Sequence, residues 1–343
     1  MKHTQCSINR WLFHAILLMG LVVLLISGQQ SMAQATTNDT KQAAPVILPG
    51  KGIKQYDFFY AGEDKSRKMY LIRKGKVVWS YIDTTGKGEI SDATMLSNGN
   101  VLFAHQFGIT LISHDKQVLW NYDAPKGFET HTAQMIGDDH VIFVQNGDPA
   151  KVIVMNIHDS TITKEFVIPA SSGTHGQVRH ARLTTAGTYL IAHMGLGKIC
   201  EYDTAGRQLL SIDFPGIWSA VPLKNGNILA TNNSNLVREI TRSGDIVWEY
   251  KLDQIPGYSI TSPQLSQLLP NGNTLINNWF NNWDSKFDAA NSQVQAIEVT
   301  PDKKIVWALR AWGDPIDLGP STTIQLLKGS GRVIENVHFG DIR

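Results

Sequence analysis

Two regularities in the sequence predict an all-β protein, a six-bladed β-propeller with four antiparallel strands per blade. The first is a short motif centred on tryptophan, with clear copies at 75–81, 116–122, 244–250 and 303–309 and degenerate copies at 161–166 and 207–212. The central positions of these copies are separated by 41, 44, 46, 38 and 59 residues. The second is a pair of short apolar runs around an Asn-Gly or similar polar turn before most copies, which is typical of a hairpin. Units of about 40–50 residues that each hold two hairpins indicate propeller blades.

The first 54 residues are expected to lie outside the propeller domain, which we place at 55–343. Residues 1–35 have the pattern of a secretory signal peptide, because Lys2 and Arg10 are followed by an apolar run and then by small residues. A retained membrane anchor is the alternative, although the apolar run is slightly short for a span of about 20 residues. Residues 36–54 form a polar and then Ala- and Pro-containing flexible leader. We therefore expect an exported protein, periplasmic or extracellular or associated with the cell surface, with no membrane span after processing.

Five complete blades are expected at 91–122, 131–167, 180–213, 218–252 and 264–309. An incomplete unit at 56–82 contains three strands and lacks the innermost one. The C-terminal strand 322–327 supplies the missing strand, so the two ends of the chain share a blade and close the ring, which hides the sheet edges. A seventh blade is the alternative if 331–338 forms a further hairpin. The repeated tryptophans are expected to pack between neighbouring blades, since aromatic residues dominate core burial.

Charge and cysteine content argue against several kinds of partner. The formal net charge is +1, and loss of Lys2 and Arg10 with the signal peptide changes it to −1. Because no basic block is present, neither nucleic acid nor an anionic membrane surface is an expected partner. Cys6 leaves with the signal peptide, so Cys200 remains alone, as a small buried side chain, and no internal disulfide is expected. We expect a monomer.

The strand order of a blade places one set of strand ends around the central channel on a single face. The second strand of each blade ends there and the first strand begins there. The second strands end on polar residues, which are His105, Gln145, His193, Asn232 and Asn278. The first strands begin with Asp92, His131, Arg179, His180, Arg182, Trp218, Gln264 and Thr322. Convergent polar groups in a concave opening predict a ligand site.

The richest part of this face is 174–182, which holds two histidines and two arginines. His175, Arg179, His180 and the nearby His193 are the candidate catalytic residues, because imidazole serves as a general acid or base near neutral pH. Arginine suits a carboxylate or sulfate through its bidentate fork. The candidate ligand-binding residues are His105, His131, Gln145, Arg182, Trp218, Asn232 and Asn278. The alternative is a set of hydrogen-bonded rim residues that tie loops together. No short His-x-x-x-His spacing is present, so no metal is expected.

An insertion at 279–288 separates the second and third strands of the last complete blade and accounts for the 59-residue step. It lies on the same face as the histidines. Its aromatic side chains stand beside Asn and Asp, a combination that suits sugar rings, so Trp279 and Trp283 are further ligand-binding candidates. The alternative is a loop that packs on its own aromatic residues.

The motifs Gly-x-Val-x-Trp-x-Tyr and Leu-Pro-Asn-Gly-Asn-x-Leu-Ile resemble the repeats of PQQ-like (quinoprotein alcohol dehydrogenase-like) propellers. The resemblance covers about residues 55–327, and in particular the chain resembles the exported six-bladed members from Bacteroidetes-type bacteria. It implies the fold and not the function. The true quinoprotein dehydrogenases have eight blades, a vicinal disulfide and an acidic calcium site. This chain has six repeats and one cysteine after processing, so PQQ is not an expected cofactor.

Together these features predict a ligand site on the His- and Arg-rich face of an exported propeller. The favoured function is binding or processing of an anionic saccharide, such as by a lyase or hydrolase, with Trp279 or Trp283 stacked on a sugar ring. A non-catalytic protein-interaction scaffold of the cell envelope is one alternative. Sulfuryl transfer is the other, because bacterial arylsulfotransferases also have His and Arg in a central channel, although no position-by-position match can be made. The enzymatic interpretations require His175, His180 and His193 to converge around an open channel.

Overall fold

The computed structural model describes residues 47–62, 67–84, 88–254, 260, 262–279, 294–313 and 316–327 of the 343-residue chain. The predicted signal peptide, the predicted hairpin at 331–338 and Trp283 lie outside these residues. Within the described residues, no helix has the length and apolar character that a membrane crossing needs.

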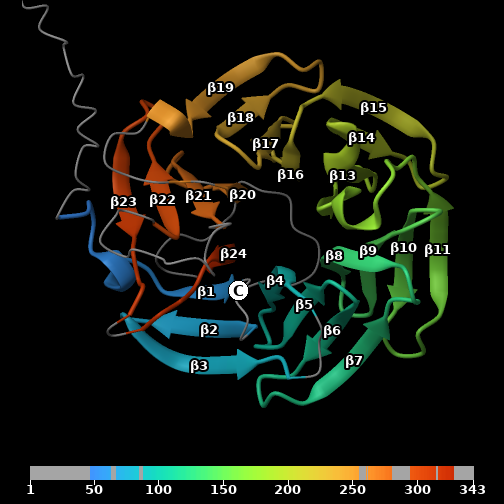
Figure 1. The fold of residues 1–343 in the computed structure, drawn as a ribbon, viewed down its shortest axis with the longest axis horizontal. Helices are drawn as coiled ribbons and strands as arrows, with labels where there is room; N and C mark the ends of the chain where they lie inside the picture. The colour runs from blue at the N-terminus through green and yellow to red at the C-terminus, as the bar shows by residue number, and fades with distance from the viewer. Residues whose placement is uncertain are drawn as a thin grey trace, which may run out of the picture. The chain divides into compact units, whose positions relative to one another are not determined.

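Six antiparallel four-stranded sheets stand as blades around a central axis (Figure 1). From the inner to the outer strand, they are β24 (Ser321–Leu326), β1 (Phe58–Gly62), β2 (Lys68–Arg73) and β3 (Lys76–Ile82); β4 (Ile90–Met95), β5 (Val101–His105), β6 (Gly108–Ile112) and β7 (Val118–Asp123); β8 (Glu129–Ile136), β9 (His140–Asn146), β10 (Lys151–Asn156) and β11 (Ile162–Val167); β12 (His180–Leu183), β13 (Tyr189–His193), β14 (Lys198–Tyr202) and β15 (Gln208–Asp213); β16 (Ile217–Pro222), β17 (Ile228–Asn232), β18 (Leu236–Ile240) and β19 (Ile246–Lys251); and β20 (Pro263–Leu268), β21 (Thr274–Asn278), β22 (Ala296–Val299) and β23 (Ile305–Leu309). Single 3₁₀ turns lie in the connections at η1 (Gly52–Lys54), η2 (Thr174–Gly176), η3 (Met194–Leu196) and η4 (Leu252–Gln254). The predicted six-bladed propeller is confirmed.

Burial decreases from the axis to the rim of each blade. Every residue of β5 is buried, whereas most residues of β7, the outermost strand of the same sheet, are exposed or half-buried. The apolar clusters lie between neighbouring blades: Phe59 and Trp79 of one blade pack with Phe103 of the next. Strands in the middle of a blade, such as β5, are therefore largely apolar on both faces, as strands covered on both sides require.

The two ends of the chain share one blade, as predicted. The C-terminal strand β24 pairs in antiparallel register with β1, where Phe58 faces Leu326. A glutamine on β24 then joins this blade to the next one, because the Gln325 amide accepts from the backbone N–H of Met95 at 2.8 Å and donates to its carbonyl at 3.0 Å. The ring is thus closed by hydrogen bonds within the shared sheet and by amide contacts between inner strands.

The outermost strand of every blade contains a β-bulge at the centre of the repeated motif. In each sheet, the central motif residue pairs with the last residue before the register shift. These pairs are Trp79–Leu71, Trp120–Leu111, Lys164–Val154, Leu210–Glu201, Trp248–Glu239 and Trp307–Glu298. The two degenerate copies therefore keep the backbone geometry of the repeat even though they lack its tryptophan.

Each repeated tryptophan contacts the neighbouring unit, which confirms the expectation that they pack between blades. The indole Nε1–H of each donates a hydrogen bond beyond its own sheet. The acceptors are the His114 carbonyl for Trp79 (2.8 Å), the Ser160 hydroxyl for Trp120 (3.2 Å), the Pro301 carbonyl for Trp248 (3.0 Å) and the Gly52 carbonyl for Trp307 (2.9 Å). The motif thus supplies both a bulge within the blade and a contact to the next unit.

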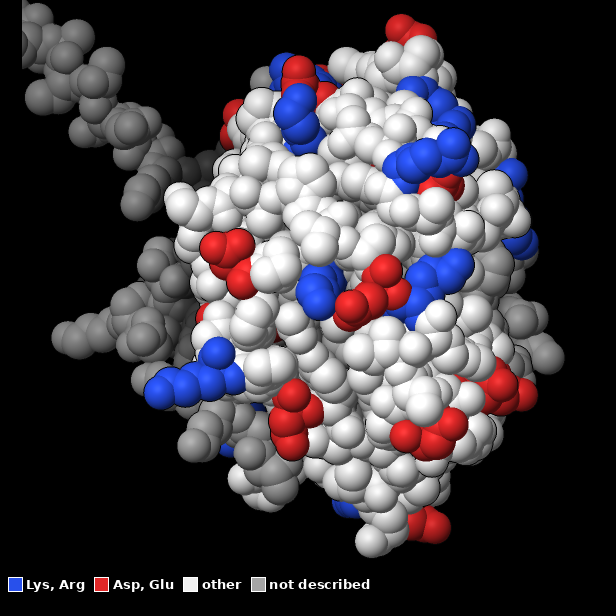
Figure 2. Space-filling view, turned by 90° about the vertical axis from the view of Figure 1, so that its right-hand side faces the viewer, with Lys and Arg blue, Asp and Glu red and all other residues white. Residues whose placement is uncertain are grey.

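The outer surface carries charges of both signs. Figure 2 shows Lys and Arg interspersed with Asp and Glu on one side of the molecule, without a large patch of either sign.

The contact made by Trp307 should contribute strongly to stability. Its side chain is fully buried, so Trp307→Ala is expected to lower the free energy of unfolding by about 3–5 kcal/mol. The matched control is Val306→Ala on the same strand, whose side chain is partly exposed and whose loss should cost within about 0.5 kcal/mol. Urea unfolding followed by tryptophan fluorescence and circular dichroism measures both values, and equal losses would contradict the inter-blade role.

Candidate functional site

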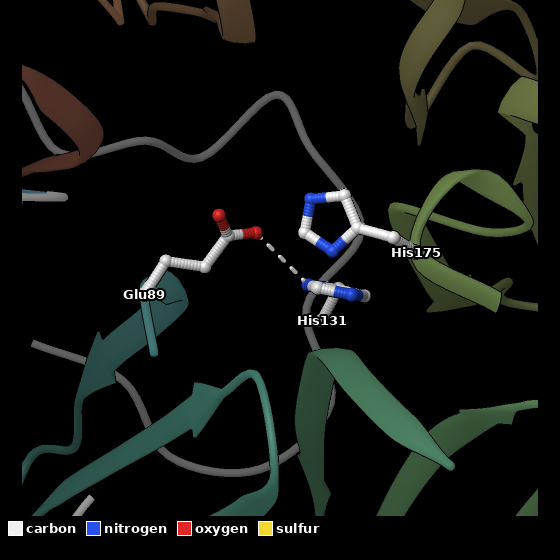
Figure 3. Close-up of side chains that lie close together, drawn as sticks. All are labelled: Glu89, His131 and His175. Atoms are coloured by element: carbon white, nitrogen blue, oxygen red, sulfur yellow. Dashed lines mark ion pairs between the residues drawn. The ribbon is translucent and has the colours of Figure 1, made fainter. Parts of the chain in front are cut away.

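A cluster of charged and imidazole groups lies at the axis, where three successive blades begin. Glu89 directly precedes β4, Glu129 and His131 lie on β8, His175 lies in η2, and Arg179 directly precedes β12. Because inner strands of neighbouring blades run side by side, residues about 40 to 50 positions apart in sequence meet here. Figure 3 shows the carboxylate of Glu89 and the rings of His131 and His175 directed toward one another. We call these five residues the mouth cluster.

Glu129 is the acceptor at the centre of the mouth cluster. Its Oε2 accepts from Nε2 of His131 at 2.9 Å and from Nδ1 of His175 at 2.8 Å, and its Oε1 accepts from the Gln106 amide at 2.9 Å. Burial alone would raise the pKa of Glu129, but the hydrogen bonds from His131, Gln106 and His175 outweigh it and lower the pKa to about 2. Glu129 is therefore a carboxylate at every physiological pH.

The hydrogen bonds to Glu129 fix which nitrogen of each histidine holds a proton. The Glu129 carboxylate only accepts, so the ring nitrogens that contact it, Nε2 of His131 and Nδ1 of His175, are protonated. In the neutral ring of His175, this leaves the lone pair on Nε2. The His175 side chain is 52% exposed, and among the described residues its Nε2 has no hydrogen-bond partner. His175 thus has one nitrogen anchored to a carboxylate and the other free to accept a proton.

His131 is buried between the two glutamates. Its ring stands edge-on to that of His175, with centroids 5.1 Å apart. On the side opposite Glu129, its Nδ1 lies 3.1 Å from Oε1 of Glu89 and accepts from the Arg179 guanidinium at 3.0 Å. Arg179 also forms an ion pair with Glu89. The guanidinium therefore lies between two acceptors, one a carboxylate and one an imidazole.

Two arginine–carboxylate pairs reach from β12 past β8 to the strand β4. The outer pair is Arg179 with Glu89, and the inner pair is Arg182 with Asp92, which is bidentate at 2.8 and 2.9 Å. Thr132 on the intervening strand hydrogen-bonds both members of the inner pair, at 3.0 Å each. The two pairs clamp three blades together at the axis.

The role expected for Arg179 and Arg182, binding the carboxylate or sulfate of a ligand, stays a prediction, and these ion pairs compete with it. Both guanidinium groups are already matched by carboxylates of the chain. Arg179 also stacks on Trp218, with its central carbon 4.8 Å from the ring centroid. With both imidazoles neutral, the mouth cluster carries two carboxylates and one guanidinium, so its net charge is negative.

His180 and His193 do not join His175. Nδ1 of His180 donates to the Ala220 carbonyl at 3.2 Å on β16, and Nε2 of His193 is 3.0 Å from the Tyr202 hydroxyl on β14. Both rings are buried, and this burial lowers the pKa of His180 to about 3 and that of His193 to about 4. The three histidines therefore do not converge, and the condition that the sequence sets for an enzyme built on all three is not met. Of these three residues, only His175 keeps an exposed ring that could act on a ligand.

The remaining predicted ligand-binding residues make contacts within the fold. The Asn232 carboxamide caps the following turn through the backbone N–H groups of 234–236, and Asn278 bridges the backbone of Ser262 and Val294. Gln145 accepts from the Tyr122 hydroxyl, and His105 lies 3.5 Å from the Thr110 hydroxyl. Trp279 is half-buried, and its Nε1 has no partner among the described residues. Their predicted role in ligand binding stays a prediction.

The lining of a polar pocket of about 440 Å³ includes Thr174, the residue before His175, but not His175 itself. Its lining combines the loop after β9 with the loop before η2, including Asp148, Ser171, Ser172 and Thr174. The buried Gln177 amide fixes the two loops to each other, because it bonds the backbone of Gly147 in both directions and the Ser171 carbonyl. The pocket is therefore a polar depression with several hydroxyl groups, next to the turn η2 that carries His175.

Two members of the mouth cluster, Glu129 and Glu89, were not predicted from the sequence. Glu129 stands two positions before His131, and this spacing on a strand places both side chains on the same face. That Glu-x-His spacing was a detectable signal. Glu89 lies at the end of a connection, and nothing in the local sequence distinguishes it from other loop acids.

Comparisons with known proteins show the fold. No family model and no curated protein sequence matches the chain. Among solved structures, a protein of unknown function from Bacteroides caccae is 23% identical, with a TM-score of 0.69 over 80% of this chain and 99% of that chain. A streptogramin B lyase is 15% identical, with a TM-score of 0.53 over 80% and 88%. A catalytically inactive His-to-Ala variant of virginiamycin B lyase from Staphylococcus aureus, solved with quinupristin, is 14% identical, with a TM-score of 0.52 over 77% and 87%. The chain is similar to these in architecture alone.

The inner pair, Arg182 with Asp92, should contribute to stability as a coupled pair rather than as two independent residues. Arg182→Met leaves the Asp92 carboxylate buried without its partner and is expected to cost about 3–5 kcal/mol of unfolding free energy. In the double variant with Asp92→Asn, the loss should be smaller than the sum of the single losses. The control is Lys151→Met, which removes an exposed pair with Glu165 and should cost less than about 1 kcal/mol. Additive losses in a urea-unfolding cycle would contradict the clamp.

The buried histidines should make stability depend on pH. Their pKa values are lower in the folded state than the ordinary value of about 6.5, so between these values the unfolded chain binds more protons. Stability is then complete above pH 6.5 and falls as the pH drops toward 4 and 3, by about 1.4 kcal/mol per pH unit for each histidine. Between pH 5 and 6, His193→Gln should reduce this slope by about 1.4 kcal/mol per pH unit, the contribution of one histidine. The control is His158→Gln, whose exposed side chain should change the free energy of unfolding at pH 7 by no more than about 0.5 kcal/mol. An unchanged slope in His193→Gln would refute the assignment.

Proposed function

We propose that the mouth cluster is an acid–base catalytic centre in which His175 is the general base and Glu129 its positioning residue. The observation that carries the proposal is the 2.8 Å hydrogen bond from Nδ1 of His175 to Glu129, combined with a half-exposed ring. A base that is open to a ligand and oriented by a carboxylate behind it is an arrangement that enzymes use to remove a proton.

The chemistry follows from the two protonation states of His175. Its Nε2 takes a proton from a substrate hydroxyl, a water or an activated carbon, and the resulting imidazolium is stabilised by Glu129. In a lyase, the electrons of the broken C–H bond form a double bond as the leaving group departs. In a hydrolase, the deprotonated water attacks the scissile bond, which breaks with its electrons on the leaving oxygen, and the imidazolium of His175 returns its proton to that oxygen. The low pKa of Glu129 keeps the transferred proton on the imidazole rather than on the carboxylate.

A hydroxyl-rich substrate suits the surroundings of His175 better than an anionic one. The adjoining pocket offers Ser171, Ser172 and Thr174 as hydrogen-bonding groups. An anionic saccharide would have to compete with Glu89 for Arg179 inside a cluster that is already negative. We therefore propose an uncharged oligosaccharide in place of the anionic saccharide that the sequence predicts.

The comparisons support an enzyme by analogy of fold alone. Two of the similar propellers are named as lyases, and one of these is inactive when a histidine is replaced by alanine. Fold similarity at this level does not carry function with it, so the proposal rests on His175 and Glu129. We further propose that the repeats belong to the PQQ-like propellers and that the protein is exported, on the sequence motifs given above.

The test is turnover of a panel of neutral and uronate-containing oligosaccharides, followed by reducing ends and by the ultraviolet absorbance of unsaturated products. His175→Asn should lower kcat by about 10²–10⁴-fold, the usual contribution of a general base, and Glu129→Gln should lower it because the amide no longer holds the correct tautomer. His158→Asn is the control, since His158 is an exposed histidine away from the site. Full activity of His175→Asn would overturn the proposal.

An interaction scaffold is the second candidate, because the outer strands expose repeated apolar pairs. These are Val77 and Val78, Val118 and Leu119, and Ile246 and Val247, all more than two-fifths exposed. Absence of turnover on the whole panel, and on an aryl sulfate, would favour this function over catalysis.

A further inference from the structure

The geometry points to a binding site for a divalent transition-metal ion, for which Zn²⁺ is the probe, formed by Glu89, His131 and His175. The inference rests on the site of the proposed function. Its test, however, reads metal binding rather than turnover, so the two can fail separately.

The three side chains offer ligand atoms that all lie within 4.8 Å of one another. Figure 3 shows that they approach from three directions around a common space. The closest pair is Nδ1 of His131 and Oε1 of Glu89, at 3.1 Å. A zinc ion binds nitrogen and oxygen at about 2.0–2.2 Å, so the side chains would rotate to draw the three ligand atoms together around it. Two imidazoles and a carboxylate are a donor set that such ions favour.

Glu129 prepares both histidines for this role. Histidines that bind a metal commonly donate their other ring N–H to a carboxylate, which fixes the tautomer and increases the basicity of the ligating nitrogen. Here one carboxylate does this twice, for Nε2 of His131 and for Nδ1 of His175. The nitrogens left without a proton are Nδ1 of His131, which faces Glu89, and the exposed Nε2 of His175.

A cationic group already occupies part of this position. The Arg179 guanidinium donates to Nδ1 of His131 and pairs with Glu89, which are two of the three atoms that a metal would take. The cluster is therefore complementary to positive charge, and its net charge is negative with neutral imidazoles. Metal binding must displace Arg179 from these acceptors, so the arginine and the metal compete.

Competition with Arg179 gives the site a distinctive response to mutation. Arg179→Met should bind Zn²⁺ more tightly than the wild type, by about tenfold, since it removes both a competitor and a like charge. Glu89→Gln and His175→Asn should bind it more weakly, by about tenfold or more. His175→Asn changes an exposed side chain, so its folding is secure. Adventitious binding at surface histidines would follow neither trend.

The experiment is calorimetric titration of the EDTA-treated, tag-free protein with Zn²⁺, with a thermal melt of each variant as a check on folding. His140→Asn is the matched control, because it removes a surface histidine that is hydrogen-bonded to Asp139 at 2.8 Å. The expected result is one site per chain that Arg179→Met strengthens and that Glu89→Gln and His175→Asn weaken, with no change in the control. Equal affinity across these variants, or no binding even by Arg179→Met, would overturn the inference.

The same titration separates this inference from the proposed function. If the metal takes Nε2 of His175, Zn²⁺ should inhibit turnover in the wild type, because the base is no longer free. Zn²⁺ binding without turnover of any substrate would leave the metal site standing and remove the catalytic proposal. Turnover that depends on His175, with no Zn²⁺ binding by any variant, would support the catalytic proposal and remove the metal site.

Discussion

The fold depends on the fact that no blade can cover its own faces. Each inner strand is buried on both sides, and the apolar clusters lie between sheets rather than within one. A single blade would expose both of its apolar faces to water, so stability comes from the contacts with its two neighbours, as in other repeat proteins. In a ring, this requirement holds for every blade at once, and it is met only if the first and last units also pair.

The repeated motif provides contacts between neighbouring blades at the rim, and β24 provides the pairing that joins the first and last units. The bulge recurs in all six outer strands, including the two that lack tryptophan, so it is a property of the blade backbone. The indole hydrogen bonds are confined to four blades and add contacts to the next unit. Pairing of β24 with β1 then completes the fourth strand of the shared blade and joins the two ends of the chain.

Closure of the ring also creates the site. It holds the starts of β4, β8 and β12 side by side, so that acids and bases from three blades meet at the axis. Two arginines of the β12 region form ion pairs with two acids of the β4 region across the intervening strand. Glu129 and the two histidines are the members of the mouth cluster that stand outside these ion pairs. Among them, a single carboxylate orients two imidazoles. The same orientation suits proton transfer at Nε2 of His175 and cation binding with Glu89, because both need a lone pair with a fixed direction.

The sequence by itself determined the number of blades, their limits within two residues, the shared closing blade and the structural role of the tryptophans. These follow from local periodicity, which is repeated six times and therefore leaves little ambiguity. It also named His131, His175 and Arg179, which the structure brings together. It did not separate His175 from His180 and His193, because a histidine on a strand looks the same whether its ring faces solvent or a backbone carbonyl. It could not match Arg179 with Glu89 or Arg182 with Asp92, which are 90 residues apart in each case. Only the closed ring decides such pairs, since an ion pair depends on distance in space and a repeat pattern specifies distance along the chain.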